Sequence, residues 1–241
     1  MASATHHGVR LDPAPCDGAA HRAWFHEARL QGYLPAPEPE DAMCIPVFYA
    51  TTHGQTRRIA ERIASVLRGE GHDSVASDVT STEALRLHWR SVHGAVLAAS
   101  LHAGTHPRAA REFVQGNVDG FNAVPSWFVS VSLSAASANP QERLAAGRIA
   151  RAFLASACWA PRQLSCVAGR LVYTQYSLLT RWLMRGIARR ERATTDASCD
   201  QDFTDWAALD RDTHQFGRDV RESVRLRTQA EHYKSDDATT C

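Results

Sequence analysis

The chain has 241 residues, of which 44% are hydrophobic, so it is long enough to bury one full core. Its 27 Lys and Arg residues are balanced by 26 Asp and Glu residues, which excludes the basic character typical of nucleic-acid-binding proteins. The six cysteines are scattered and form no C-x-x-C pair, which excludes a disulfide scaffold and a zinc arrangement. We therefore expect reduced thiols, no metal site and a cytoplasmic location.

Residues 1–42 are rich in proline, histidine and acidic residues, and we expect them to form a flexible N-terminal extension. The functional domain is expected to cover residues 43–228, with a C-terminal tail at 229–241. The start of the sequence has no apolar signal core, and no apolar stretch has membrane-spanning length. The sequence therefore predicts a soluble protein, or one that lies on a membrane surface.

The most informative stretch runs from Cys44 to Thr56 and reads C-I-P-V-F-Y-A-T-T-H-G-Q-T. An apolar strand pattern ends at Ala50, a short polar loop follows, and a helical pattern begins at Arg57. The start of a helix offers unpaired backbone N–H groups and partial positive charge, which suit a phosphate. The loop lacks the Lys of a Walker A motif and the glycines of G-x-G-x-x-G. An ordinary strand-to-helix turn with a capping threonine is the alternative interpretation.

Strand and helix patterns alternate along the rest of the chain. The first helix pattern, at 57–68, is followed by a polar strand at 74–79, a weak helix at 83–89 and an apolar strand at 92–99. The second half contains helices at 108–118, 141–157 and 204–226 and strands at 124–133 and 164–172. Asp200, Asp202 and Asp205 precede the last helix and are expected to cap it.

This alternation predicts an α/β fold: a doubly wound, five-stranded parallel sheet with helices on both faces. In the flavodoxin-like strand order 2-1-3-4-5, ligands bind beyond the carboxyl ends of the strands, where the order reverses. The loops at 51–56, 100–106 and 132–135 are then expected to meet at that point. Three small polar loops favour a flat cofactor with a phosphate tail.

Several motifs resemble one known family. They are A-T-T-H-G-Q-T-R-R-I-A at 50–60, A-A-S-L-H-A-G-T-H at 98–106, P-S-W-F-V-S-V-S-L at 125–133, V-A-G-R-L-V-Y at 167–173 and F-T-D-W at 203–206. Their order and spacing resemble the flavodoxin-like, quinone-dependent protoporphyrinogen IX dehydrogenases of haem biosynthesis. The resemblance covers residues 43 to about 220. It implies an FMN cofactor, oxidation of protoporphyrinogen IX to protoporphyrin IX, and menaquinone or ubiquinone as the acceptor.

The resemblance also implies which residues hold the cofactor. The FMN phosphate would be held by Thr51, Thr52, His53, Gly54, Gln55 and Thr56. The isoalloxazine ring would be flanked by Ser100, Leu101, His102, Ala103, Gly104, Ser132, Leu133, Ser134 and Ala135. Neither ring-flanking loop contains an aromatic residue, so Leu101, His102, Leu133 or residues elsewhere are expected to contact the ring. A soluble flavodoxin-type electron carrier, and a non-catalytic module that has lost FMN, are the alternative functions.

Residues 173–192 read as an inserted helix that is both basic and amphipathic. Leucines and Trp182 gather on one side, and Arg181, Arg185 and Arg189 recur every four residues beside them. This composition is typical of a helix at the interface of an anionic membrane, which suits a quinone acceptor and the cytoplasmic face of the inner membrane. The alternatives are a helix packed on its own sheet, a homo-oligomer interface, and arginines that bind porphyrin propionates.

Other side chains are candidates for the chemistry. Loss of hydride from a porphyrinogen is accompanied by loss of a proton, so His102 and His106 are candidate bases, with solvated loop histidines as the alternative. Arg170 follows a glycine at a strand end and is interpreted as a propionate contact or a surface ion pair. Cys44 and Cys166 lie on predicted strands and are expected to be inert, buried thiols.

Overall fold

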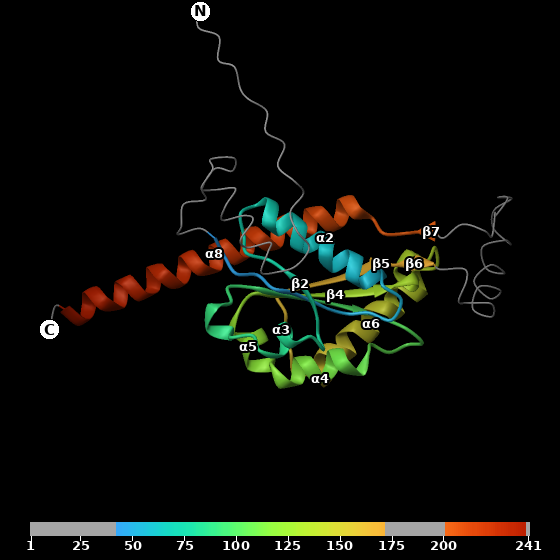
Figure 1. Cartoon of the computed structure of the whole chain (residues 1–241), viewed down its shortest axis with the longest axis horizontal. Helices are drawn as coiled ribbons and strands as arrows, with labels where there is room; N and C mark the ends of the chain where they lie inside the picture. The colour runs from blue at the N-terminus through green and yellow to red at the C-terminus, as the bar shows by residue number, and fades with distance from the viewer. Residues whose placement is uncertain (1–41, 172–200, 240–241) are drawn as a thin grey trace, which may run out of the picture. The chain divides into compact units, whose positions relative to one another are not determined.

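The computed structural model describes residues 42–171 and 201–239, and from Met43 onward these belong to one compact unit, Met43–Cys241 (Figure 1). Its centre is a parallel sheet of five strands in the order β2-β1-β3-β4-β5, which confirms the predicted order. The strands are β1 (Val47–Ala50), β2 (Ala76–Asp78), β3 (Ala95–Ser100), β4 (Ser126–Ser132) and β5 (Gln163–Ala168). Because β1 pairs with both β2 and β3, the strand order reverses between β1 and β3.

Helices cover both faces of this sheet (Figure 1). One face packs against α2 (Gln55–Gly69) and α8 (Trp206–Thr239), whose apolar residues join those of the strands in one core. The other face carries a second core, to which four helices contribute: α3 (Thr82–Leu85), α4 (Arg108–Gly116), α5 (Val118–Ala123) and α6 (Pro140–Ser156). The described chain also contains two short 3-10 turns, η1 (Trp89–Ser91) and η2 (Leu133–Ala136).

The two cores follow from the alternation of side chains along each strand. Trp127 and Val129 of β4 face α2 and α8, whereas Phe128 between them lies in the opposite core. All seven residues of β4 are buried, as expected for a strand covered by helices on both sides. Trp127 packs its ring 5.7 Å from that of Phe216 on α8, so the last helix closes one core.

The predicted last strand, 164–172, is too long because the chain changes partner at Gly169. The parallel pairing of β5 ends where Ser132, the last residue of β4, pairs with Ala168. After Ser132 the chain of β4 continues as η2, so the residues after Ala168 have no strand of the five-stranded sheet to pair with. Arg170–Leu171, β6, instead pairs antiparallel with β7, Gln201–Asp202.

Helix ends also differ from the sequence prediction. The weak helix expected at 83–89 is only the single turn of α3, followed by η1. The last helix does not end at residue 226, because no glycine or proline follows Gly217, and α8 continues to Thr239. Asp205 accepts a hydrogen bond from Ala208 N at 2.8 Å and so caps α8 as predicted. Asp202 lies in β7 instead, and Asp200 lies outside the described residues.

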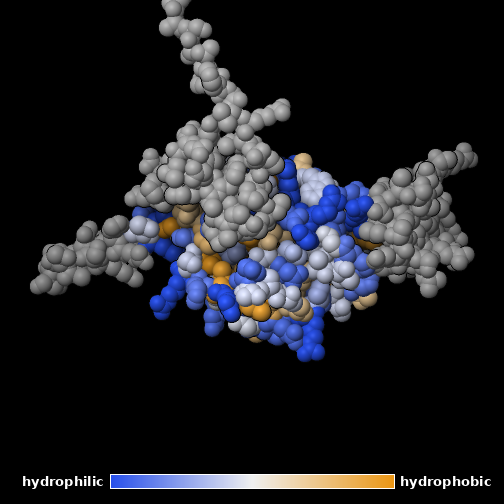
Figure 2. Space-filling view, in the orientation of Figure 1, coloured by the Kyte–Doolittle hydropathy of each residue, from blue (hydrophilic) through white to orange (hydrophobic). Residues whose placement is uncertain are grey.

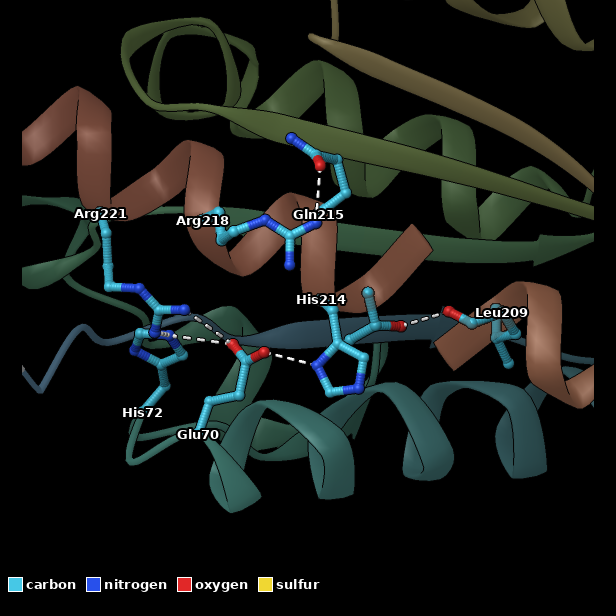
Figure 3. Close-up of polar contacts among 8 residues, drawn as sticks. Glu70, His72, Leu209, His214, Gln215, Arg218 and Arg221 are labelled. Carbon is cyan, nitrogen blue, oxygen red and sulfur yellow. Dashed lines mark hydrogen bonds and ion pairs between the residues drawn. The ribbon is translucent and has the colours of Figure 1, made fainter. Parts of the chain in front are cut away.

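The C-terminal end of α2 is tied to α8 by charged side chains, shown in Figure 3. Glu70, which follows α2, accepts a hydrogen bond from Arg221 at 3.2 Å and also contacts His214. A Cβ atom added at Gly217 would lie 2.4 Å from the Glu70 carboxylate, so an alanine there would displace the flexible end of the Glu70 side chain. Nearer the start of α8, Asp210 accepts two hydrogen bonds from Arg62, at 2.8 and 2.6 Å.

Hydrophilic residues cover most of the coloured surface in Figure 2, and hydrophobic ones show in small separate areas. Among the described residues, the exposed large hydrophobic side chains are Leu85, Leu144 and Leu226, on three different helices. No helix in the described ranges has the length and apolar composition needed to cross a membrane. All but the last residue of the predicted extension at 1–42, and the whole predicted helix at 173–192, lie outside the described residues.

The two strand cysteines differ in their exposure. Cys44 is half-buried, and burial, reinforced by the nearby Asp73, raises the pKa of its thiol to about 11. Cys166 is exposed on β5, an edge strand of the five-stranded sheet. The prediction that Cys166 is buried is therefore wrong, because an edge strand is only partly covered.

Candidate functional site

The carboxyl ends of the central strands open into a cleft of about 340 Å³. Its walls include residues from the loop after β1, the loop after β3 and the turn after β4, which are the three segments that the sequence predicted to converge. This volume falls at the lower end of the range of small-molecule sites, about 300–1,000 Å³. The cleft lies at the edge where the strand order reverses, where α/β sheets of this type bind ligands.

The loop after β1 leads into the start of α2, which has features that suit an anion. Gly54 precedes α2 with a φ of +87°, in the left-handed region that favours glycine, and its N–H donates to Thr51 Oγ1 at 2.9 Å. No described side chain caps this end of α2, and its first turn carries no acidic residue. The N–H groups of the first turn therefore keep their partial positive charge for an incoming anion. The hydroxyls of Thr51 and Thr56 belong to residues that line the same cleft.

The loop after β3 forms a tight two-residue turn. His102 N and Thr105 N each donate to the carbonyl oxygen of the other residue at 3.0 Å. The residues between them, Ala103 and Gly104, have φ values of 48° and 79°, the combination that two-residue hairpins of this kind require. The start of this loop is linked to the loop after β1 by a 3.3 Å contact between the hydroxyls of Thr52 and Ser100.

His102 and His53 meet at the cleft, with their ring centroids 5.6 Å apart. Partial burial, reinforced by the adjacent His102, lowers the pKa of His53 below its usual value. His53 is therefore neutral near pH 7, and its ring nitrogens can hydrogen-bond with a ligand. His53 and His102 both line the cleft.

His106 does not line the cleft. It is 7% exposed, and its ring packs edge-on against Phe128 and Phe153, with centroids 5.3 and 5.0 Å away. Its Nδ1 is 3.0 Å from the carbonyl oxygen of Ser100, and burial lowers its pKa to about 4. This placement gives His106 a structural role in the loop after β3 and does not support the role of base expected from the sequence.

The third wall is the turn after β4. Ser132 Oγ accepts a hydrogen bond from Ala135 N at 3.2 Å, which folds the chain into η2 and leaves Leu133 and Ser134 at the cleft. Thr52, Gly54 and Ala135 are not among the described lining residues, although the sequence placed them in the site. They shape the loops through the contacts given above.

Sequence reasoning missed the contribution of α6. Glu142, Ala145, Ala146 and Ile149 line the cleft and recur at helical spacing on one face of this helix. That spacing is visible in the sequence, but it is equally typical of a helix face buried on its own sheet. Glu142 is the one carboxylate among the described lining residues.

Arg170 lies at the cleft, next to Gly169, as its position at the end of a predicted strand suggested. The other basic candidates, Arg181, Arg185 and Arg189, and also Trp182, lie outside the described residues. Within the described ranges no group of three or more His, Cys, Asp or Glu side chains has the arrangement of a metal site.

A parallel sheet of order 2-1-3-4-5, with a ligand-sized cleft at the carboxyl ends of its strands, is the arrangement of the flavodoxin class of α/β proteins. In agreement, the family model described as a flavodoxin domain matches residues 46–198. The chain is 31% identical over 161 residues to the protoporphyrinogen IX dehydrogenase [quinone] of Escherichia coli strain K12, covering 66% of this chain and 87% of that protein. The protein of the same name from Leishmania major is 29% identical over 171 residues, covering 70% and 73% of the two chains.

The chain therefore belongs to the flavodoxin family and, within it, to the protoporphyrinogen IX dehydrogenase [quinone] enzymes, which confirms the family predicted from the motifs. Solved flavodoxins are more distant. One from Streptococcus pneumonia TIGR4 has 15% identity and a TM-score of 0.44, covering 75% of this chain and 99% of the flavodoxin. Flavodoxin 1 from Bacillus cereus has 14% identity and a TM-score of 0.44, covering 72% and 97%.

Proposed function

We propose that this protein is an FMN-dependent oxidoreductase that oxidises protoporphyrinogen IX to protoporphyrin IX and passes the electrons to menaquinone or ubiquinone. The observation that carries the proposal is the convergence of the three loops after β1, β3 and β4 on one cleft beside an uncapped helix start. The similarity to the Escherichia coli and Leishmania major proteins named protoporphyrinogen IX dehydrogenase [quinone] supports the choice of substrate and acceptor.

The residues at the start of α2 fit a phosphate monoester. A Cβ atom added at Gly54 would meet no atom within 4 Å, so the outside of the loop is open to a ligand. The first-turn N–H groups and the hydroxyls of Thr51 and Thr56 offer several donors without a full positive charge. This donor set suits the phosphate of FMN better than a diphosphate, for which a lysine or further glycines are typical.

Bound FMN would supply the hydride acceptor, while the protein positions the substrate and moves protons. His102 lines the cleft, and we assign to one of its imidazole nitrogens the proton that leaves the porphyrinogen as hydride is lost. Leu101 and Leu133, from the two loops expected to flank the ring, offer apolar side chains to a flat ring. Arg170 is suited to bind a propionate carboxylate of the substrate at the end of β5.

The quinone acceptor resides in a membrane, and the proposed route to it is the basic segment 173–192. Arg181, Arg185 and Arg189 would pair with anionic lipid headgroups while Trp182 lies at the interface. This hypothesis rests on the sequence pattern and assigns the protein to the cytoplasmic face of the inner membrane.

The decisive experiment measures porphyrin fluorescence after anaerobic mixing of the full-length protein with FMN, protoporphyrinogen IX and a soluble quinone. We expect fluorescence to rise with turnover only when protein, FMN and quinone are all present. A protein that binds FMN but does not accelerate the oxidation would be an electron carrier. A protein that binds no flavin would be a non-catalytic module, and either result would overturn the proposal.

A further inference from the structure

A polar cluster behind the cleft joins parts of the chain that are almost 150 positions apart in the sequence. We name it the Gln55 clamp, formed by Gln55, Asp202 and Thr204. Gln55 Nε2 donates to Asp202 Oδ1 at 3.1 Å and to Thr204 Oγ1 at 2.9 Å. Gln55 and Thr204 are both 8% exposed, so the hydrogen bond between them is buried, whereas the bond to Asp202 is partly buried.

The clamp is anchored to the sheet through Thr204. Its hydroxyl donates to the carbonyl oxygen of Ala168, the last residue of β5, at 2.8 Å, and its N–H donates to Asp202 Oδ1 at 3.0 Å. Burial raises the pKa of Asp202, but hydrogen bonds from Thr204 and Gln55 and the nearby Arg58 outweigh this, so the pKa lies below its usual value. Asp202 is therefore ionised near neutral pH, which strengthens the hydrogen bonds that it accepts.

Both ends of the Gln55 side-chain amide are occupied by protein groups. Its Nε2 bonds to Asp202 and Thr204, and its Oε1 accepts a hydrogen bond from Arg58 Nη1 at 3.3 Å. Gln55 is also the first residue of α2, where the helix start has no side-chain cap among the described residues. Gln55 thus lines the cleft with its amide turned to other protein groups, and its side chain holds the helix start in place.

We propose that Asp202 and Thr204 are positioning residues for the phosphate of the bound cofactor, acting through Gln55. They would keep the first turn of α2 in place, so that its N–H groups could hold the phosphate. This inference rests on the proposed function for the identity of the cofactor. Asp202 and Thr204 are not among the described residues that line the cleft, so their effect on a ligand has to be indirect.

The test compares binding of FMN with binding of riboflavin, which has the same ring and no phosphate. Dissociation constants are measured by quenching of flavin fluorescence on the full-length protein. The Thr204→Val variant keeps the shape of the side chain and removes the hydroxyl, and Thr204→Ser is its matched control. We expect Thr204→Val to weaken FMN binding about fivefold or more, with riboflavin binding unchanged and Thr204→Ser close to wild type.

A double variant shows whether the effect passes through Gln55. In a Gln55→Ala background, Thr204→Val should cause no further loss of the preference for FMN over riboflavin, because the contact is already absent. Asp202→Ala should lower the same preference and provides a second variant if Thr204→Val folds poorly. Asp202→Asn keeps the acceptor oxygen and should keep the preference.

Equal loss of FMN and riboflavin binding in Thr204→Val would indicate general damage to the fold and overturn the proposal. An unchanged preference in both Thr204→Val and Asp202→Ala would overturn it as well. These outcomes are distinct from failure of the proposed function, which would appear in the wild-type protein as no flavin binding or no porphyrinogen oxidation.

Discussion

Arg221 on α8 donates to the Glu70 carboxylate at 3.2 Å and to His72 Nε2 at 2.6 Å, and so closes the far end of the α2–α8 contact (Figure 3). His72 is buried, with 4% of its surface exposed, and burial together with the Arg221 charge lowers its pKa. The imidazole is therefore neutral and accepts the hydrogen bond from the guanidinium. This contact lies at the opposite end of α2 from the cleft, so it bears on stability rather than on ligand binding.

We expect Arg221→Met to lower the free energy of unfolding by about 1–2 kcal/mol, because two partly buried hydrogen bonds are lost. The Glu70 carboxylate also loses its contact with a guanidinium and retains its contacts with the imidazoles of His214 and His72. Urea unfolding followed by circular dichroism measures this change. Arg218→Met is the matched control on the same helix, because among the described residues Arg218 hydrogen-bonds to Gln215 at the exposed surface. Equal stability losses in the two variants would contradict a specific role for Arg221.

The buried His106 makes stability depend on pH. Its pKa is about 4 in the folded protein against 6.5 for an unperturbed histidine, so below pH 6.5 the unfolded chain binds a proton that the folded protein does not. The stabilisation is complete above pH 6.5 and is lost as the pH falls toward 4. Between pH 7.5 and pH 5 this single group should lower the free energy of unfolding by about 2 kcal/mol.

Urea unfolding of wild type and His106→Asn at the two pH values isolates this contribution. The asparagine amide can still donate to the Ser100 carbonyl but does not titrate. The free energy of unfolding of the variant should therefore change by about 2 kcal/mol less than that of wild type between pH 7.5 and pH 5. The variant should also be less stable at pH 7.5, because the ring contacts with Phe128 and Phe153 are lost. The same pH dependence in both proteins would show that His106 titrates normally.

Two glycines at opposite ends of α2 should respond in opposite ways to alanine. Gly54 has a φ of +87°, so Gly54→Ala should lower the free energy of unfolding by about 1 kcal/mol and weaken FMN binding by tilting the helix start. Gly69 is helical and has open space around a Cβ atom, so Gly69→Ala should raise stability by about 0.5–1 kcal/mol without affecting flavin affinity. Unfolding curves and flavin titrations on both variants check the pair.

His102→Gln tests the proposed base. If His102 accepts the substrate proton, the variant should lower kcat by about 100-fold or more while flavin is still bound. His88→Gln is the control, because His88 is an exposed histidine that lies outside the cleft lining. Wild-type kcat in His102→Gln would remove His102 from the mechanism.

The membrane hypothesis predicts that wild-type protein floats with vesicles containing anionic lipid and that a triple Arg181, Arg185, Arg189→Glu variant does not. A triple Arg211, Arg218, Arg225→Glu variant has the same change of net charge on exposed positions of α8 and should float like wild type. Flotation of all three proteins to the same extent would refute a role for the basic segment. Loss of flotation in both variants would indicate dependence on net charge alone.

The order of the elements of the sheet and the polar loop after β1 could be predicted from the sequence, because each depends on residues that are neighbours in the chain. The apolar run to Ala50, the polar turn and Gly54 determine a helix start that can bind an anion. Likewise, Gly104 marks the tight turn after β3. These local rules do not depend on which distant segment packs nearby.

Tertiary structure alone decided the partners and the burial of individual side chains. Whether His106 faces the cleft or the core depends on Phe128 and Phe153, which come from two other elements. Gln55 hydrogen-bonds to residues of the segment before α8, and no local pattern relates positions so far apart. A side chain's burial and its partners depend on the packing of whole elements against one another, so they follow only once the sheet has assembled.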